Sequence, residues 1–521
     1  MSTDEKEGIR HEHPAVHETA LPSPSSSSPS DSGPTDVDDA WKFLNANRQA
    51  TADIPDEDTT DIKRIRRKVD LRIVPLAFFL YVLQFTDKLV LNYAGVMTLR
   101  EDLKLTGNDF SNLVTSTYVA IVVWEIPTIY FLQKFPVAKY LAVNAILWGV
   151  ATACGAAATN FQTMLVCRIF LGIFEATVNP SIMLIAGRWY TKPEQAPRLS
   201  FWLFGLAVGQ VFGGGVSYGF QSLPSGTTMA GWRIMFILLG GLTVVFGALT
   251  FWIMPDNPME PKWLTPQEKV ALLKHISVNQ TGVENKKVRM AEVWEALRDP
   301  QVWLFWLIIF LLATNAGVTV GYSATLIRNW GYTPKQATLL NMPGGAVAAV
   351  SILGPGWAVR HNIGQRWAWV LITLAPAILG AGLMSFLPNS NKPGLLAGIF
   401  LINFFPGSMT VFWNWAPANI AGATKRAFVT AMIAALSATG SAIGPQAFQA
   451  KDAPDYRPAK IMALSVMAAS AILTVLLFAY YVWQNKSRRK VGDKETRDAF
   501  MSPEVWVRMT DRENKAFRYV Y

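Results

Sequence analysis

Charged residues and cysteines are both scarce in this chain of 521 residues. Only 16% of its residues are charged, against roughly 25% in an ordinary soluble domain. The two cysteines, Cys154 and Cys167, lie inside apolar runs, and two cysteines build neither a disulfide framework nor a cysteine-ligated metal cluster. A phosphate-binding Gly-Lys-Ser/Thr loop, a metal-ligand cluster and a nucleophile with its base are also missing. These absences argue against an enzyme and against an ATP-driven pump, and we expect no cofactor and no metal.

Apolar residues, in contrast, make up 51% of the chain. They gather in runs of about twenty, the length of helix that crosses a hydrocarbon core about 30 Å thick. The runs predict an all-α membrane protein with 12 transmembrane helices in two six-helix bundles. The predicted spans are 73–95, 109–133, 138–158, 163–187, 198–221 and 232–254 in the first half, and 302–327, 337–358, 367–387, 394–416, 426–450 and 461–484 in the second.

These runs divide the chain into five parts. Residues 1–62 are rich in Ser, Pro and acidic residues and predict a disordered cytosolic tail, because they offer too little apolar surface to offset the entropy of ordering. The N-terminal bundle (63–254), a central cytosolic loop (255–301), the C-terminal bundle (302–484) and a cytosolic C-terminal tail (485–521) follow. Within the central loop, Thr265, Pro266 and Glu268 predict the start of a short amphipathic helix.

The net charge of +10 does not point to a nucleic-acid partner, because Lys and Arg flank the apolar runs instead of forming a soluble basic face. They are denser on alternate loops, in a set that includes Lys425 and Arg426, and this alternation predicts that both termini are cytosolic. The first thirty residues contain no apolar stretch, so we expect no cleavable signal peptide. The sequence thus predicts a multi-pass protein of the cell membrane.

Five charged residues stand out well inside the predicted spans, where an unpaired charge costs several kcal/mol, so each is a functional candidate. Asp87 and Lys88 lie in the first span, Glu125 in the second, and Arg168 and Glu175 in the fourth. The last two are about two helical turns apart and therefore share one helix face. Burial disfavours a charged carboxylate and a nearby cation favours it. These two opposing effects on the carboxylate suit an acid that exchanges a proton and lies beside a cation that binds an anion.

The second half has no comparable charges in its spans and offers polar and aromatic side chains instead. These side chains suit contacts with an uncharged part of a substrate, although polar residues in spans also join helices to each other. The candidates are Asn315, Tyr322, Asn403, Trp413 and Asn414.

The six-plus-six pattern with a central loop resembles the major facilitator superfamily over almost the whole chain after residue 60. The stretch RIFLGIFEATVNP at 168–180 is similar to the fourth helix of its anion:cation symporter branch, and Gly231-Trp232-Arg233 to the start of its sixth helix. Segments at 85–108, 131–141, 279–287 and 510–521 resemble the fungal allantoate permease family. Members of that family import carboxylates, vitamins and their precursors, ureides and small peptides across the plasma membrane.

The resemblance implies a proton-coupled symporter that carries a small organic anion. We assign proton coupling to Glu175 and Asp87, and binding of the anion to Lys88 and Arg168. An alternative is a static ion-pair network between helices one and four, in which Asp87 pairs with Lys88 or Arg168. The branch usually has Asp-Arg in the first helix, and lysine lacks the bidentate fork of arginine, so recognition of a carboxylate is looser here.

Two loops match the regions that control bundle movement in the superfamily. After the second span its Gly-and-Asp motif is reduced to Lys134 and Lys139, whereas Arg360 and Arg366 keep more of it after the eighth span. We expect these four residues to gate the movement. Glu125 joins them, because it precedes Pro127, which frees backbone groups and kinks a span.

Two other functions stay open. One is an exporter of a secondary metabolite or toxin, built on the same fold, although Gln210 stands where proton-driven drug exporters usually have Pro and so favours import. The other is a membrane sensor that signals through its tails. The expected partners are a small anionic substrate, protons and the lipid bilayer, and we expect a monomer.

Overall fold

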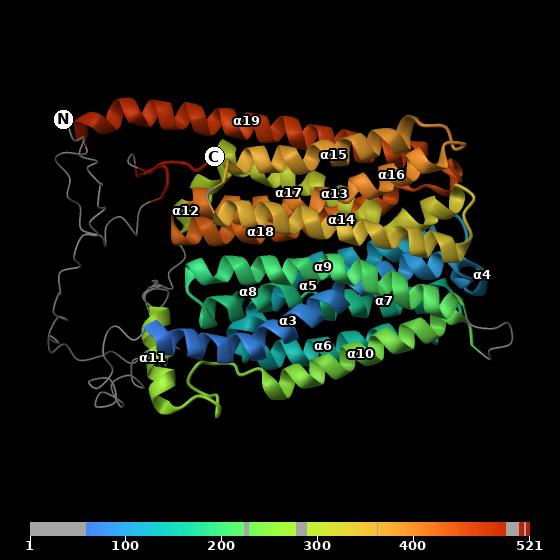
Figure 1. Cartoon of the computed structure of the whole chain (residues 1–521), viewed down its shortest axis with the longest axis horizontal. Helices are drawn as coiled ribbons and strands as arrows, with labels where there is room; N and C mark the ends of the chain where they lie inside the picture. Colours follow the sequence, from blue (N-terminus) through green and yellow to red (C-terminus); the bar gives the residue numbers. More distant parts are fainter. Residues whose placement is uncertain (1–58, 223–228, 278–288, 362, 496–509, 515–516) are drawn as a thin grey trace, which may run out of the picture.

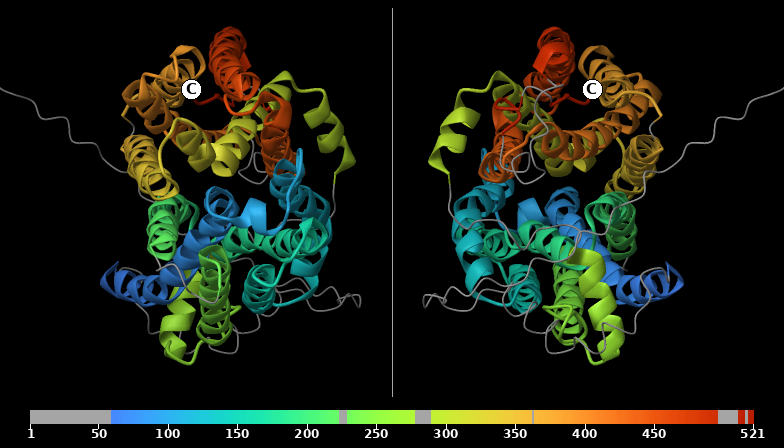
Figure 2. Two further views of the ribbon diagram at one scale, coloured as in Figure 1. Left: turned by 90° about the vertical axis from the view of Figure 1, so that its right-hand side faces the viewer. Right: turned by 90° about the vertical axis from the view of Figure 1, so that its left-hand side faces the viewer.

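The computed structural model describes residues 59–222, 229–277, 289–361, 363–495, 510–514 and 517–521. Within these ranges the chain is helical and contains no strand, and 12 helical spans are long and apolar enough to cross a membrane. The predicted fold class is therefore confirmed. Figure 1 shows the spans lying side by side, with the first six below the last six, and Figure 2 shows the same two groups viewed along the helices.

The N-terminal bundle contains six spans, the fourth of which is made of two helices. Its helices are α3 (Thr59–Val96), α5 (Asp109–Lys134), α6 (Val137–Gly155), α7 (Phe161–Glu175) with α8 (Val178–Trp189), α9 (Lys192–Gln221) and α10 (Gly231–Ile253). A single turn, α4 (Leu99–Asp102), follows the first span.

The C-terminal bundle repeats this pattern, and its fourth span is again made of two helices. Its helices are α13 (Pro300–Asn329), α14 (Pro334–Arg360), α15 (Arg366–Phe386), α16 (Lys392–Ile402) with α17 (Phe405–Asn419), α18 (Ala423–Ile443) with the 3-10 turn η1 (Gly444–Ala447), and α19 (Arg457–Glu495). The short turn η2 (Ala450–Asp452) precedes α19. Between the bundles lie α11 (Pro266–Ser277) and α12 (Met290–Leu297).

The two ends of the bundles differ. The start of α3, the end of α19 and the linker helices α11 and α12 lie at one end, which we call the terminus face, on the left of Figure 1. The opposite end, with α4 and the connection from α9 to α10, is called the loop face. Across the interface α9 packs against α14, α5 against α18 and α3 against α13.

Predicted and observed spans agree to within a few residues except at the two ends of the membrane region. The first helix starts at Thr59 instead of residue 73, and the last continues to Glu495. The early start is stabilised by ion pairs that hydropathy does not reveal. The guanidinium of Arg198 binds both oxygens of Asp70, at 2.7 and 2.6 Å, and Arg66 pairs with Glu194.

The amphipathic helix predicted in the central loop is present as α11. Thr265 and Glu268 form the expected capping box, with reciprocal hydrogen bonds of 3.1 and 3.2 Å. The helix is held on the N-terminal bundle, because Glu268 pairs with Lys68 and His275 Nε2 lies 3.1 Å from Glu194 Oε1. One end of the linker is thus fixed to the first bundle.

Helices α6 and α10 approach so closely that glycine is required on both. A Cβ atom on Gly240 would lie 2.5 Å from the carbonyl oxygen of Gly149, and one on Gly149 would lie 2.7 Å from that of Gly240. Small residues allow this approach and the packing contacts that it brings in a membrane. Gly241, one residue along, has nothing within 4 Å of the corresponding position.

We expect Gly240→Ala to lower the Tm of the purified protein, because the new methyl group forces α6 and α10 apart. Gly241→Ala is the matched control, and its Tm should stay the same or rise slightly, since alanine favours a helix by about 1 kcal/mol over glycine. Thermal unfolding in detergent measures both. Equal Tm values for the two variants would contradict the close packing.

Glu194 lies outside the spans, at the terminus face, and its ionisation is tied to α11. Burial alone would raise the pKa of Glu194, but hydrogen bonds from the Thr191 backbone, His275 and Arg66 outweigh it and lower the pKa to about 2. Because this value is below the ordinary value of 4.5, the carboxylate stabilises the fold above pH 4.5. The stabilisation is lost as the pH falls towards 2.

Glu194→Gln should therefore lower the Tm near neutral pH, and its difference from the wild type should shrink between about pH 5 and about pH 3. Glu260→Gln, at an exposed carboxylate, is the control. A Tm difference that stayed constant from neutral to acidic pH would show that the charge of Glu194 is not involved.

Candidate functional site

The fourth span of each bundle is interrupted at a corresponding place. Helix α7 ends at Glu175 and α8 starts at Val178, while α16 ends at Ile402 and α17 starts at Phe405. Interrupted helices at matching positions of the two halves are a physical indicator of a carrier's binding site, because they expose backbone groups inside the membrane. Glu175 ends the first broken helix, and Asn403 directly follows the other.

The structure brings four of the five charged candidates of the N-terminal bundle into one region, and Glu125 is the exception. Lys88 Nζ lies 2.9 Å from Glu175 Oε1, and the Glu175 side chain is completely buried. Neither oxygen of this carboxylate accepts a hydrogen bond of regular geometry from a described residue. The pair is therefore an ion pair without aligned hydrogen bonds, in a low-dielectric setting where charge is costly.

Asp87 has partners that the sequence did not indicate. Its Oδ2 accepts a hydrogen bond of 2.6 Å from Thr152 and another from the indole of Trp148, both on α6. Its Oδ1 has no hydrogen-bond partner among the described residues. Among those residues Asp87 forms no ion pair with Lys88 or Arg168, the pairs that the static alternative expected.

Arg168 is buried and faces the same region from α7. Its guanidinium lies over the ring of Phe236, 5.1 Å from the centroid, a favourable contact for a cation. Its Nη2 has no hydrogen-bond partner among the described residues. The group therefore retains an unused donor next to Asp87 and Lys88.

A narrow cavity lies beside three of these charged groups. It is lined from three helices, by Asp87, Lys88, Leu91, Val114, Thr117, Tyr118, Arg168 and Leu171. Its space suffices for about one water molecule, so a substrate enters only if the helices around it move. Figure 1 places its helices α3, α5 and α7 within the N-terminal bundle.

The candidates of the second half are at different depths. Asn315 is fully buried, and neither side-chain oxygen nor nitrogen has a partner among the described residues. Asn403 donates to the carbonyl of Ile399 in its own span, and Asn414 to that of Thr410. Trp413, next to Asn414, is half-buried. The described contacts do not join these residues into one cluster.

Tyr322 lies in the contact that closes the loop face. Its hydroxyl is hydrogen-bonded to Ser111 of α5, and its ring stacks on Phe448 with centroids 3.9 Å apart. Nearby, Gln446 donates to Thr115 at 2.9 Å and Asn108 to Gln449 at 2.6 Å.

A second polar cluster joins the bundles between α3, α9 and α14. The Tyr93 hydroxyl donates to the carbonyl of Gln210, and Asn341 donates to that hydroxyl. Between the described residues, hydrogen bonds across the interface lie in the half of the spans nearest the loop face or near their middle. The bundles are thus joined by hydrogen bonds at the loop face.

Four of the five residues expected to gate the bundle movement lie near the terminus face. The fifth, Glu125, lies on α5, which ends there. Glu125 is partly buried, and one of its oxygens has no hydrogen-bond partner among the described residues. Lys134 is exposed, whereas Lys139 binds the carbonyl of Phe251. Arg366 lies 3.5 Å from the carbonyl oxygen of Asn414. The side chain of Arg360 lies outside the described residues.

Two six-helix bundles joined by hydrogen bonds at one face, with a buried charged cavity in the first, have the architecture of a membrane carrier. The comparisons with known proteins agree with this class. The chain belongs to the Major Facilitator Superfamily, whose family model matches residues 77–445. The prediction of that family is confirmed, as is the prediction that the protein is a transporter and not an enzyme.

Two relatives in Saccharomyces cerevisiae cover most of the chain. The "Thiamine pathway transporter THI73" is 35% identical over 88% of this chain and 86% of that protein. The "Allantoate permease" is 29% identical over 93% of this chain and 90% of that protein. The chain thus resembles the fungal allantoate permease, as its motifs suggested.

Solved structures share the fold. A D-xylose-proton symporter superposes with a TM-score of 0.59 at 15% identity, covering 78% of this chain and 97% of that chain. A bacterial homologue of the human lysosomal transporter Spinster gives 0.56 at 17% identity, covering 80% and 96%.

Sequence reasoning missed the partners of Asp87 because Trp148 and Thr152 look like ordinary residues of an apolar span. Their spacing of four residues, on one face of α6, is the only signal that the sequence offers. In the sequence, Gln210 is informative only because it stands in place of a proline. In the structure it connects the bundles through hydrogen bonds.

Thr152→Val should destabilise the protein, because it removes a hydrogen bond from a buried carboxylate without changing the side chain's shape. The expected loss is about 1–3 kcal/mol, seen as a lower Tm. Thr243→Val is the matched control, since Thr243 is buried on α10 and donates only to the carbonyl of Leu239 in its own helix. A Tm as high as that of the control would mean that Thr152 does not hold Asp87.

Proposed function

We propose that the protein is a proton-coupled symporter that carries a small organic anion into the cell. The observation that supports this proposal most directly is the buried pair of Lys88 and Glu175 beside Arg168, whose Nη2 is unpartnered. These groups combine an acid that can exchange a proton with two cations that can hold a carboxylate.

Charge balance would couple binding of the anion to binding of the proton. In their ionised forms, Asp87 and Glu175 compensate Lys88 and Arg168, so the empty site is neutral. An anion would leave one uncompensated negative charge in a low-dielectric region, which is costly. A proton taken up by Glu175 restores neutrality and releases Lys88 from its ion pair. The anion and the proton therefore occupy the site together more favourably than either does alone.

The two cations would bind the carboxylate of the substrate. Arg168 offers its free Nη2, and Lys88, once released, offers an ammonium group to the same carboxylate. Asp87 stays in place through Thr152 and Trp148 and keeps Arg168 compensated. Of the relatives, the allantoate permease is named for a carboxylate, which fits this chemistry.

The proposed orientation places the terminus face in the cytosol and the protein in the cell membrane as a monomer. The alternation of Lys and Arg along the loops supports this orientation. Because hydrogen bonds join the bundles at the loop face, movement of the helices around the site would open it towards the cytosol first. Release of the Tyr322 and Tyr93 contacts would then open it to the outside.

Glu175→Gln should abolish concentrative uptake, because a neutral amide cannot carry the proton. Uptake of labelled carboxylates, vitamins and ureides into expressing cells, at two external pH values and with a protonophore, identifies the substrate and tests coupling. We expect accumulation to fall about tenfold or more, while exchange of substrate across the membrane persists. Glu260→Gln, at an exposed carboxylate outside the spans, should accumulate normally.

Two results would contradict the proposal. Accumulation by the wild type that ignores pH and protonophore would rule out proton coupling. Accumulation that survives in Glu175→Gln would rule out Glu175 as the carrier of the proton.

A further inference from the structure

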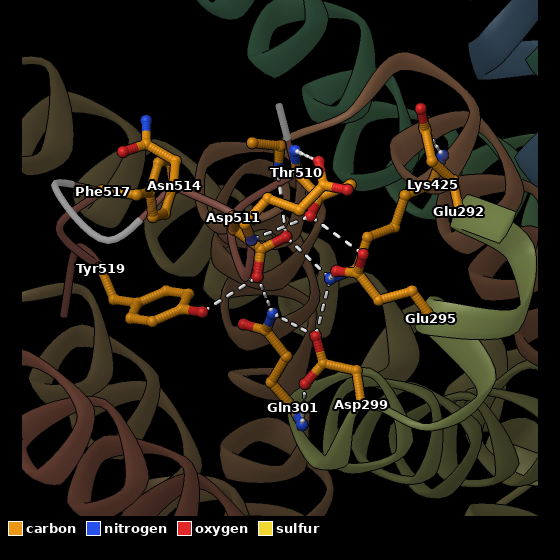
Figure 3. Close-up of polar contacts among 12 residues, drawn as sticks. Glu292, Glu295, Asp299, Gln301, Lys425, Thr510, Asp511, Asn514, Phe517 and Tyr519 are labelled. Atoms are coloured by element: carbon orange, nitrogen blue, oxygen red, sulfur yellow. Dashed lines mark hydrogen bonds and ion pairs between the residues drawn. The ribbon is translucent and has the colours of Figure 1, made fainter. Parts of the chain in front are cut away.

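The last residues of the chain are docked on the terminus face of the C-terminal bundle. The sequence predicted a tail over 485–521, but α19 continues to Glu495, and residues 510–514 and 517–521 pack against α12, α17, α18 and α19. We call these last residues, 510–521, the C-terminal segment. Figure 3 shows its contacts around Asp511. Thr510 and Asp511 are completely buried, and Tyr519 is almost so.

Lys425 is the centre of this contact. Its side chain is fully buried, and its Nζ lies 2.8 Å from both Asp299 and Asp511 and 2.9 Å from Glu295. The three carboxylates come from α12, the residue before α13 and the C-terminal segment. Their oxygens are close enough to hold a metal ion, but the ammonium group of Lys425 fills that position. The sequence indicated Lys425 as one of the loop cations that set the orientation in the membrane. The structure shows that it also binds three carboxylates.

The surrounding groups satisfy the excess negative charge. Asp299 caps α13 by accepting from the backbone of Gln301, and the positive end of a helix dipole favours a carboxylate there. The side-chain amide of Gln301 donates to Asp511 at 2.7 Å, and Tyr519 donates to it at 2.9 Å. Asp511 thus has four donors, from Lys425, Gln301, Tyr519 and the backbone N–H of Ala421. Such a complete set of partners is what a buried carboxylate needs.

The end of the segment is recognised through its backbone. Asn419 of α17 donates to the carbonyl of Val520 and accepts from its N–H, both at 2.8 Å. Asn485 of α19 does the same for Tyr519, at 2.8 and 3.0 Å. Trp415 adds a third bond, to the Val520 carbonyl. Side-chain amides here replace the neighbouring strand that usually pairs with an extended peptide.

We propose that this end of the C-terminal bundle is a peptide-binding site whose ligand is the chain's own C-terminal segment. The site selects the peptide by one carboxylate, at Asp511 in a turn, and by backbone pairing near the peptide's end. Two independent anchors, one ionic and one through amides, distinguish a built site from a tail lying on a surface.

Occupation of the site holds the linker helix α12 on the bundle. Thr510 donates to Glu295 of α12 at 2.9 Å, and Glu295 also binds Lys425. Glu292, one turn earlier, accepts from the backbone N–H of Lys425 at the start of α18. Loss of Asp511 removes one of three anions around Lys425 and loosens the contacts that join α12 to α18.

Hydrogen exchange of the full-length protein in detergent tests this site, with Asp511→Asn as the variant. Its side chain keeps its shape but brings an amide to Lys425 in place of a charge. We expect exchange of the amides of Glu513, Tyr519 and Val520, and of α12, to become about tenfold faster. Arg512→Gln is the matched control in the same segment, because Arg512 is exposed, and its exchange should equal that of the wild type.

The second measurement adds a synthetic peptide of residues 510–521 in excess to the Asp511→Asn protein. If the site binds the segment as a ligand, the peptide restores slow exchange in α12, whereas a peptide carrying the same Asp→Asn change does not. The proposal is overturned if Asp511→Asn and Arg512→Gln exchange alike, if the wild-type segment exchanges without protection, or if the peptide leaves α12 unprotected.

Discussion

The cost of placing charge in an apolar medium governs this molecule. Each ionised group within the spans needs compensation from a neighbour, because the bilayer offers neither water nor counterions. The N-terminal bundle meets this requirement with two acids and two bases grouped on α3 and α7, whose charges sum to zero. In the C-terminal bundle a fully buried cation, Lys425, lies at the terminus face, where three carboxylates surround it. The two halves therefore share a fold but differ in where they keep their charge.

The same constraint explains what the sequence could predict. Length and apolarity of the runs are enough for the number of spans, because a helix must satisfy its backbone within itself wherever lipid surrounds it. Charges inside those runs, such as Asp87 and Glu175, are visible for the same reason. Partners are not visible, since Trp148 is a common residue in a span and only the packing of α6 against α3 brings its indole to Asp87.

Two other features could not be predicted from local sequence. The first helix starts at Thr59 because its charged turns meet α9 and α11, which are remote in the chain. The C-terminal segment is polar and charged, and a composition of that kind is ordinarily read as a solvated tail. Its docking depends on Asn419, Lys425 and Asn485, which come together only in the folded bundle.

Both ends of the linker are fixed, each to its own bundle. Helix α11 is held on the first bundle through Lys68 and Glu194, and α12 on the second through Lys425. Motion between the bundles would then carry α11 with the first bundle and α12 with the second. Among the described side chains, hydrogen bonds join the bundles at the loop face but not at the terminus face. A rocking motion of one bundle against the other would reverse this difference.

The choice between a static ion-pair network and a working site depends on unused hydrogen-bonding groups. A network that only joins helices gains by satisfying every polar atom, and buried polar atoms in folded proteins are nearly always satisfied. In the charged cluster, Nη2 of Arg168 and Oδ1 of Asp87 have no described partner, and Glu175 holds Lys88 without an aligned hydrogen bond. Three incomplete groups, two of which line one narrow cavity, are costly as structure. They are useful to a site that must accept a carboxylate and a proton and then release both.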